Sequence, residues 1–122
     1  MSDPLYHEMI LDLYRHPLNH EKLAEFDIHH KEHNPLCGDT VELFIKLGNG
    51  DTVEQVSWTG EGCAISQAFA SLTTNFIKQK TKTEIEKIDP TEILEMLGLP
   101  NLNPTRLRCA MLALEAVKKS LK

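Results

Sequence analysis

The chain has 122 residues, of which 41% are hydrophobic and 25% are charged, and it carries a net charge of −5. This length predicts a single domain, residues 1–122, that can bury a hydrophobic core without the help of disulfides. The acidic balance and the lack of a basic stripe with interleaved aromatic residues argue against nucleic acid as a partner. The sequence has no apolar run near the ~20 residues that cross a bilayer and no signal-peptide pattern at its start, so we expect a cytoplasmic protein without membrane contact.

The N-terminal segment is predicted to form an amphipathic helix. Apolar side chains recur at helical spacing through residues 3–15, and Pro17 ends the pattern. Asp3 is a suitable N-cap for this helix, and Pro4 suits its first position because the N–H that proline lacks would have no helical partner there.

A polar, histidine-rich stretch follows the first helix. We expect residues 16–36 to be mostly loop, with one short strand near residues 26–29. Three histidines of this stretch, His29, His30 and His33, lie shortly before the first cysteine. Histidines in a polar loop are expected to be solvated, and a role in metal binding is the alternative.

The apolar pattern then changes from helical to alternating. Every second residue from Val41 to Leu47 is apolar, which predicts a strand with one buried face. The pair Asn49-Gly50 tolerates the positive φ angles of a type I′ turn, so residues 52–58 are expected to return as an antiparallel partner. Trp58, at the end of this second strand, is expected in the core.

Two glycines and a cysteine mark the start of the next helix. Gly60 and Gly62 allow a tight turn from strand to helix, so we expect the helix to begin close to Cys63. Its C-terminal end is expected to carry a set of lysines, because the helix dipole favours cations there. These residues are Lys78, Lys80 and Lys82.

Two further helices are predicted to complete the chain. Asp89 and Pro90 start a short helix that ends before Gly98, and Asn103 and Pro104 start a terminal helix. The terminal helix has one predicted apolar face, made by Leu107, Met111, Leu114, Val117 and Leu121. The order of elements predicts an α+β fold, a small antiparallel β-sheet of about three strands with α-helices packed on it.

The three cysteines are the most informative residues for function. An odd number in a reducing compartment indicates metal binding or reactive thiols rather than a disulfide framework, although buried structural thiols remain the alternative. Cys37 is predicted on an exposed loop, Cys63 at a helix start and Cys109 two turns into the last helix. With the carboxylate of Asp39 they provide enough donors for a tetrahedral metal site, but no CxxC pair is present and the spacing alone does not decide the matter.

Three short motifs, each holding one of these cysteines, resemble those of a known family. The motifs are NPLCGD at 34–39, GEGCAIS at 60–66 and RLRCA at 106–110. Together with the opening segment LYHEMILDLYRHPLN they are similar, in the same order, to the U-type iron–sulfur cluster scaffolds, the family of IscU, SufU and the N-terminal domain of NifU. The resemblance covers nearly the whole chain.

The resemblance implies a function and a set of ligands. By similarity, Cys37, Asp39, Cys63 and Cys109 would ligate a [2Fe-2S] cluster or a Zn²⁺ ion. The protein would be a scaffold rather than an enzyme. It would accept persulfide sulfur from a cysteine desulfurase, with Cys37 as first acceptor or Cys109 as the alternative, and would pass the cluster to apo iron–sulfur proteins.

Two departures from the family pattern bear on partners. The segment before the third cysteine reads LPNLNPTRLRCA and lacks the Leu-Pro-Pro-Val-Lys run that a dedicated Hsp70-type chaperone reads, so that partnership is doubtful. Arg106 and Arg108 resemble the SufU type instead, yet the chain lacks the longer insertion that SufU-type members carry between the second and third cysteines. By similarity, Arg106 is expected to dock on the desulfurase, and a simply exposed side chain is the alternative. The alternative function is therefore a zinc-binding sulfurtransferase partner that stimulates the desulfurase without building clusters.

Overall fold

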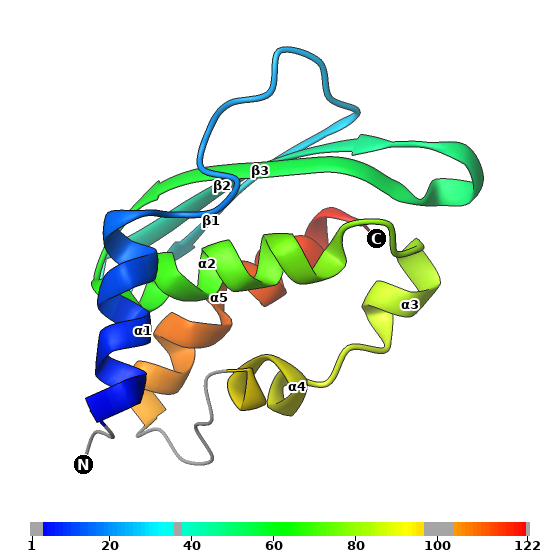
Figure 1. The fold of residues 1–122 in the computed structure, drawn as a ribbon. Coiled ribbons are helices and arrows are strands. Elements are labelled where there is room, and N and C mark those ends of the chain that lie inside the picture. The colour runs from blue at the N-terminus through cyan, green and yellow to red at the C-terminus, as the bar shows by residue number, and fades with distance from the viewer. Residues whose placement is uncertain (1–3, 36–37, 97–103, 122) are drawn as a thin grey trace.

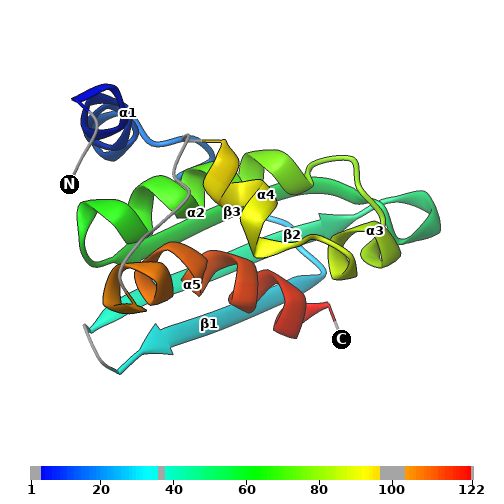
Figure 2. The same cartoon turned by 90° about the horizontal axis from the view of Figure 1, so that it is seen from below.

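The computed structural model describes residues 4–35, 38–96 and 104–121. In these residues a three-stranded antiparallel sheet, in the order β1-β2-β3, carries helices on one of its faces (Figures 1 and 2). This arrangement confirms the predicted α+β class with a small antiparallel sheet. None of the described helices is both long and apolar enough to span a bilayer. The elements are α1 (Pro4–Arg15), β1 (Ile28–Asn34), β2 (Asp39–Leu47), β3 (Val53–Glu61), α2 (Ala64–Ile77), α3 (Lys82–Glu86), α4 (Pro90–Glu95) and α5 (Pro104–Ser120).

The hairpin of β2 and β3 forms the centre of the sheet, as the alternating pattern predicted. Leu43 lies opposite Trp58 and Ile45 lies opposite Val56, and all four side chains are buried. The Trp58 indole N–H also donates a hydrogen bond of 2.8 Å to the Leu18 carbonyl, which satisfies the polar atom of this core residue. The prediction that Trp58 belongs to the core is confirmed.

The turn of this hairpin differs from the predicted type I′ turn. Residues Asn49–Asp51 form a short 3₁₀ turn, and the positive φ angles fall on Gly50 (67°) and Asp51 (56°) rather than on Asn49 and Gly50. The turn is closed by a hydrogen bond of 2.7 Å from the Gly48 N–H to the Thr52 carbonyl. A register shift between Lys46 and Leu47 accommodates the longer connection.

Strand β1 is much longer than the short strand predicted near residues 26–29, and the assignment of residues 30–34 to a loop was wrong. The strand alternates between exposed and less exposed side chains, but its inward-facing members are mostly polar. A hydrophobic period of two is therefore absent from the sequence. One of these inward-facing polar side chains, Glu32, has a partner on α5.

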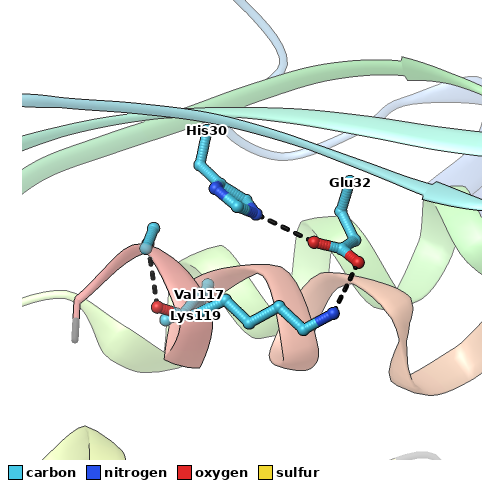
Figure 3. A network of polar contacts seen from close by, with 5 residues as sticks. His30, Glu32, Val117 and Lys119 are labelled. Carbon is cyan, nitrogen blue, oxygen red and sulfur yellow. Dashed lines mark hydrogen bonds and ion pairs between the residues drawn. The ribbon is translucent and has the colours of Figure 1, made fainter.

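This partner is Lys119, in the last turn of α5. Its Nζ lies 2.8 Å from Glu32 Oε2, and the other oxygen of Glu32 lies 2.8 Å from His30 Nε2 (Figure 3). Figure 3 shows Glu32 reaching from the strand toward the helix, with His30 beside it. The three side chains attach the edge strand to the terminal helix.

Helices α2 and α5 lie side by side on the sheet and contact each other, and α1 packs against α2 (Figure 2). The predicted apolar face of α5 is confirmed for Met111, Leu114, Val117 and Leu121, which are all buried. Leu107, in the first part of the helix, is 37% exposed, so its prediction as part of that face was wrong.

Helix α2 ends earlier than predicted. Lys78 is its C-cap, and the chain beyond it turns toward β3: the Gln79 N–H donates to the Val53 carbonyl, and the Val53 N–H donates to the Lys80 carbonyl. These bonds draw the backbone out of the helical path, so the lysines follow the helix instead of forming its last turn. Lys82 begins α3, a helix that the sequence did not predict.

Candidate metal centre

Three of the four predicted ligands converge at one end of the molecule. Asp39 is the first residue of β2 and is 1% exposed, Cys63 is the N-cap of α2 and is exposed, and Cys109 lies in α5 and is 5% exposed. One carboxylate oxygen and the two sulfur atoms all lie within 4.8 Å of one another. Three elements far apart in the sequence thus bring two thiols and a carboxylate to one point.

Cys37, the fourth predicted ligand, lies outside the described residues. The chain on either side of it is described. The Gly38 N–H donates a hydrogen bond of 2.9 Å to the Asn34 carbonyl, and Gly38 has a φ of 73°, which a residue without a side chain adopts readily. Asn34 and Asp39 face each other across β1 and β2, so the connection that contains Cys37 begins and ends next to Asp39.

The carboxylate of Asp39 is held in a defined orientation. Its Oδ1 accepts a hydrogen bond of 3.0 Å from the Cys63 N–H, and its Oδ2 lies 3.9 Å from the Cys63 Sγ. A carboxylate at the start of a helix also interacts favourably with the helix dipole. One oxygen is therefore bound to the backbone, while the other lies beside the Cys63 thiol.

The donor set and its spacing fit a metal ion or an iron–sulfur cluster. Ligand atoms bound to one tetrahedral zinc ion, at ~2.0–2.3 Å from it, are separated by roughly 3.5–3.8 Å. The present separations, 3.9 Å for one oxygen–sulfur pair and at most 4.8 Å within the group, need only a small contraction. Thiolates favour zinc and iron–sulfur clusters, whereas a carboxylate binds these soft metals less firmly.

The three histidines of β1 lie in a strand and have other partners. His29 Nε2 contacts a carboxylate oxygen of Glu42, and His33 Nδ1 lies 3.2 Å from Thr40 Oγ1. His30 contacts Glu32, as described above. In the described part of the chain, the one group of potential metal ligands contains no histidine. The alternative of a histidine-containing metal site is therefore not supported.

Arg106 and Arg108 occupy the first turns of α5, and both are exposed. The exposed Leu107 lies between them, and Arg108 directly precedes the buried Cys109 of the centre. A pocket between the end of β1 and the first half of α5 is lined by Asn34 on the strand side and by Arg108 on the helix side. Cationic and apolar side chains are thus available at the surface next to the centre.

Sequence reasoning missed Gln67, on α2. Its Nε2 donates a hydrogen bond of 3.0 Å to the carbonyl of Gly62, the residue before the predicted ligand Cys63. The spacing of four residues between Cys63 and Gln67 places both near one side of the first helical turn. That spacing was the available signal, but it does not specify which atom the amide would contact.

The fold and the centre define a class of protein, an α+β domain whose strand and helix ends present thiols and a carboxylate for metal. A sequence model of the NifU-like N-terminal domain family matches residues 5–122. The chain belongs to this family.

Comparisons with individual proteins agree with the family. The chain is 35% identical to the zinc-dependent sulfurtransferase SufU of Bacillus subtilis, over 98% of this chain and 90% of that protein. It is 31% identical to the iron–sulfur cluster assembly scaffold protein IscU of Escherichia coli, over 95% and 91%. The crystal structure of the SUF-system protein FiSufU from Fervidobacterium islandicum AW-1 superposes with a TM-score of 0.82, at 28% identity and with all of both chains covered.

Proposed function

We propose that this chain is an iron–sulfur cluster assembly scaffold that acts as a single domain. It would receive sulfur from a cysteine desulfurase, assemble a [2Fe-2S] cluster and transfer it to apo iron–sulfur proteins. The observation that carries this proposal is the convergence of Asp39, Cys63 and Cys109 within 4.8 Å in a chain of the NifU-like N-terminal domain family. Its similarity to an assembly scaffold along 95% of its length adds support.

The proposed ligands are Cys37, Asp39, Cys63 and Cys109, for either the cluster or a Zn²⁺ ion. Thiolates would supply the firm bonds, and Asp39 would supply the bond that is most easily exchanged. A cluster that must leave its scaffold benefits from one weaker ligand. The hydrogen bond between Asp39 and the Cys63 N–H keeps the carboxylate at the site when the metal bond is broken.

Sulfur transfer is proposed to occur at Cys37. The thiolate would attack the terminal sulfur of a persulfide on the desulfurase, and the sulfur–sulfur bond of the donor would break as its cysteine leaves as a thiolate. The Cys109 side chain is buried, which makes it the less accessible acceptor. Cys109 remains the second candidate because it belongs to the same centre.

The partner surface is proposed to include the exposed Arg106 beside the centre. A guanidinium can form paired hydrogen bonds with a carboxylate of the desulfurase, which gives the contact a defined geometry. An Hsp70-type chaperone is not proposed as a partner, because the motif that it would read is absent from the sequence before Cys109.

A second candidate function is a zinc-dependent sulfurtransferase that stimulates the desulfurase. The observation that favours it is the 35% identity with a protein of that description, together with Arg108 directly before Cys109. Both functions would use the same ligands, so the two differ in what occupies the centre and in the product that leaves it.

Anaerobic reconstitution tests these proposals. The protein, purified without oxygen, is incubated with ferrous iron, cysteine, a reductant and a cysteine desulfurase, and cluster absorption, iron and acid-labile sulfide are measured. If the protein is a scaffold, the wild type develops cluster absorption and passes the cluster to an apo-ferredoxin. The absorption is lost in the variants Cys63→Ser and Cys109→Ser and is kept in the control variant His33→Asn. Retention of zinc without sulfide, with faster desulfurase turnover that Cys37→Ala abolishes, would instead establish the second function.

A further inference from the structure

Both polar groups of the peptide between Gly62 and Cys63, its N–H and its carbonyl, form hydrogen bonds with side chains. Its N–H donates to Asp39 Oδ1 at 3.0 Å, and its carbonyl accepts from Gln67 Nε2 at 3.0 Å. The carbonyl of Gly62 precedes the helix, whose first backbone bond runs from the Gln67 N–H to the Cys63 carbonyl at 3.2 Å. The hydrogen bond from the Gln67 side chain to the Gly62 carbonyl is therefore additional to the backbone hydrogen bonds of α2.

Gly62 leaves the space that the carboxylate occupies. A Cβ atom at this position would lie 2.2 Å from Asp39 Oδ1 and 2.8 Å from Ser66 Oγ, both far inside contact distance. Asp39 is 1% exposed, and Ser66 is fixed by a hydrogen bond of 3.0 Å to the Cys63 carbonyl, so neither side chain can move aside easily. The φ angle of Gly62, +148°, also favours glycine.

We propose that the Gly62–Cys63 peptide is the positioning element of the metal centre, with Gln67 as the positioning residue that fixes it. This inference rests on the proposed function, in which Asp39 and Cys63 are metal ligands. The peptide determines the relative position of the Asp39 carboxylate and the Cys63 sulfur. Oδ1 accepts the Cys63 N–H, so Oδ2, which lies 3.9 Å from the Cys63 Sγ, would be the oxygen that Asp39 offers to a metal.

Hydrogen-bond partners of metal ligands commonly change metal affinity by ~10–100-fold when they are removed. Gln67→Met keeps the length of the side chain and removes the donor. Because Gln67 acts on the proposed ligands through the Gly62–Cys63 peptide, we expect the lower end of this range, about 10-fold weaker Co²⁺ and Zn²⁺ binding. The matched control is Asn75→Met, which removes an exposed amide from the same helix.

The experiment measures Co²⁺ binding by chelator competition and by the sulfur-to-cobalt and d–d absorption bands, together with thermal unfolding of the metal-free proteins. Gln67→Met is expected to weaken binding and alter the d–d bands, while its metal-free unfolding midpoint stays close to that of Asn75→Met. If Gln67→Met has the Co²⁺ affinity and the d–d bands of the wild type, the positioning role of Gln67 is wrong, while the proposed function is unaffected. If wild-type protein and Cys63→Ser bind Co²⁺ equally, without sulfur-to-cobalt bands, both this inference and the proposed function are wrong.

A second measurement needs no metal and remains informative if Gln67→Met does not fold. Gly62→Ala is introduced into the wild-type chain and into Asp39→Ala, and the loss in unfolding midpoint is compared. The backbone strain is common to both backgrounds, but the collision with the carboxylate exists only in the first. A clearly larger loss in the presence of Asp39 is expected, and equal losses would overturn the role of Gly62.

Discussion

Lys119 Nζ and Glu32 Oε2 lie 2.8 Å apart, and this contact joins the last turn of α5 to the edge strand β1, 87 positions earlier in the chain (Figure 3). Hydrogen bonds from Lys119 and then from His30 lower the pKa of the Glu32 carboxyl below its ordinary value of 4.5. The strand that leads to Cys37 is thus attached to the helix that carries Cys109. The attachment depends on an ionised carboxylate.

Glu32→Gln is therefore expected to reduce the free energy of unfolding by about 0.5–1 kcal/mol at neutral pH, the usual value of such a contact near the surface. A carboxyl whose pKa is lowered by folding stabilises the folded state above the unfolded-state pKa. That contribution is lost as pH falls through the folded-state pKa, below 4.5. The difference in unfolding free energy between wild type and Glu32→Gln, measured by urea unfolding, should thus shrink as the pH is lowered below 4.5.

Glu21→Gln is the control for this experiment. Glu21 is exposed and takes part in none of the ion pairs found among the described residues. It should have little effect at either pH. An equal loss for Glu32→Gln at neutral and acid pH would show that packing, rather than charge, attaches β1 to α5.

Two leucines of α5 offer a matched comparison of burial. Leu114 is 2% exposed and Leu107 is 37% exposed, although both fall on the same apolar stripe in the sequence. Leu114→Ala is expected to cost about 2–5 kcal/mol of unfolding free energy, because it removes buried contacts and leaves a cavity. Leu107→Ala should cost less than about 0.5 kcal/mol in the same denaturant experiment. Similar losses at the two positions would contradict the depth of packing described here.

Leu107 also illustrates what the sequence could predict about the fold. Helical spacing identifies which side of α5 faces the core, but not how far along the helix its neighbours extend. In β1 the reverse problem arises. The inward-facing Glu32 is polar, and besides its neighbour His30 it is paired with Lys119, a residue remote in sequence. The hairpin of β2 and β3 was predictable because its buried side chains are apolar and its partners are local.

The candidate site was predictable to a similar extent. The three cysteine motifs indicated the ligands, and the described part of the chain brings Asp39, Cys63 and Cys109 together. The hydrogen bond from Gln67 that supports the site was not predictable. The bond from Gln67 to the Gly62 carbonyl depends on the path of the backbone before α2, which no spacing rule specifies.

The short helix α3 depends on its N-cap. Thr81 Oγ1 accepts a hydrogen bond of 3.2 Å from the Glu84 N–H, and Glu84 Oε1 accepts one of 2.9 Å from the Thr81 N–H. Thr81→Ala removes the first bond and is expected to cost about 1 kcal/mol, read as a lower thermal unfolding midpoint. Thr83→Ala, an exposed threonine within the same helix, should be neutral or slightly stabilising because alanine favours helix. Equal destabilisation by the two changes would argue against the cap.

Metal binding should distinguish the cysteines of the centre from the histidines of β1. Zinc that binds the folded state only will raise the unfolding midpoint, by an amount that grows with zinc concentration. Cys63→Ser and Cys109→Ser each remove a proposed ligand. Each should therefore lower zinc affinity by more than the ~10–100-fold that loss of an outer hydrogen-bond partner causes, and should largely abolish the shift in midpoint. The double change His29→Asn and His33→Asn should retain the full shift, since these rings contact Glu42 and Thr40 instead of the centre. A zinc-induced shift that survives the serine variants but disappears in the histidine variant would place the metal on the outer face of the sheet and contradict the centre proposed here.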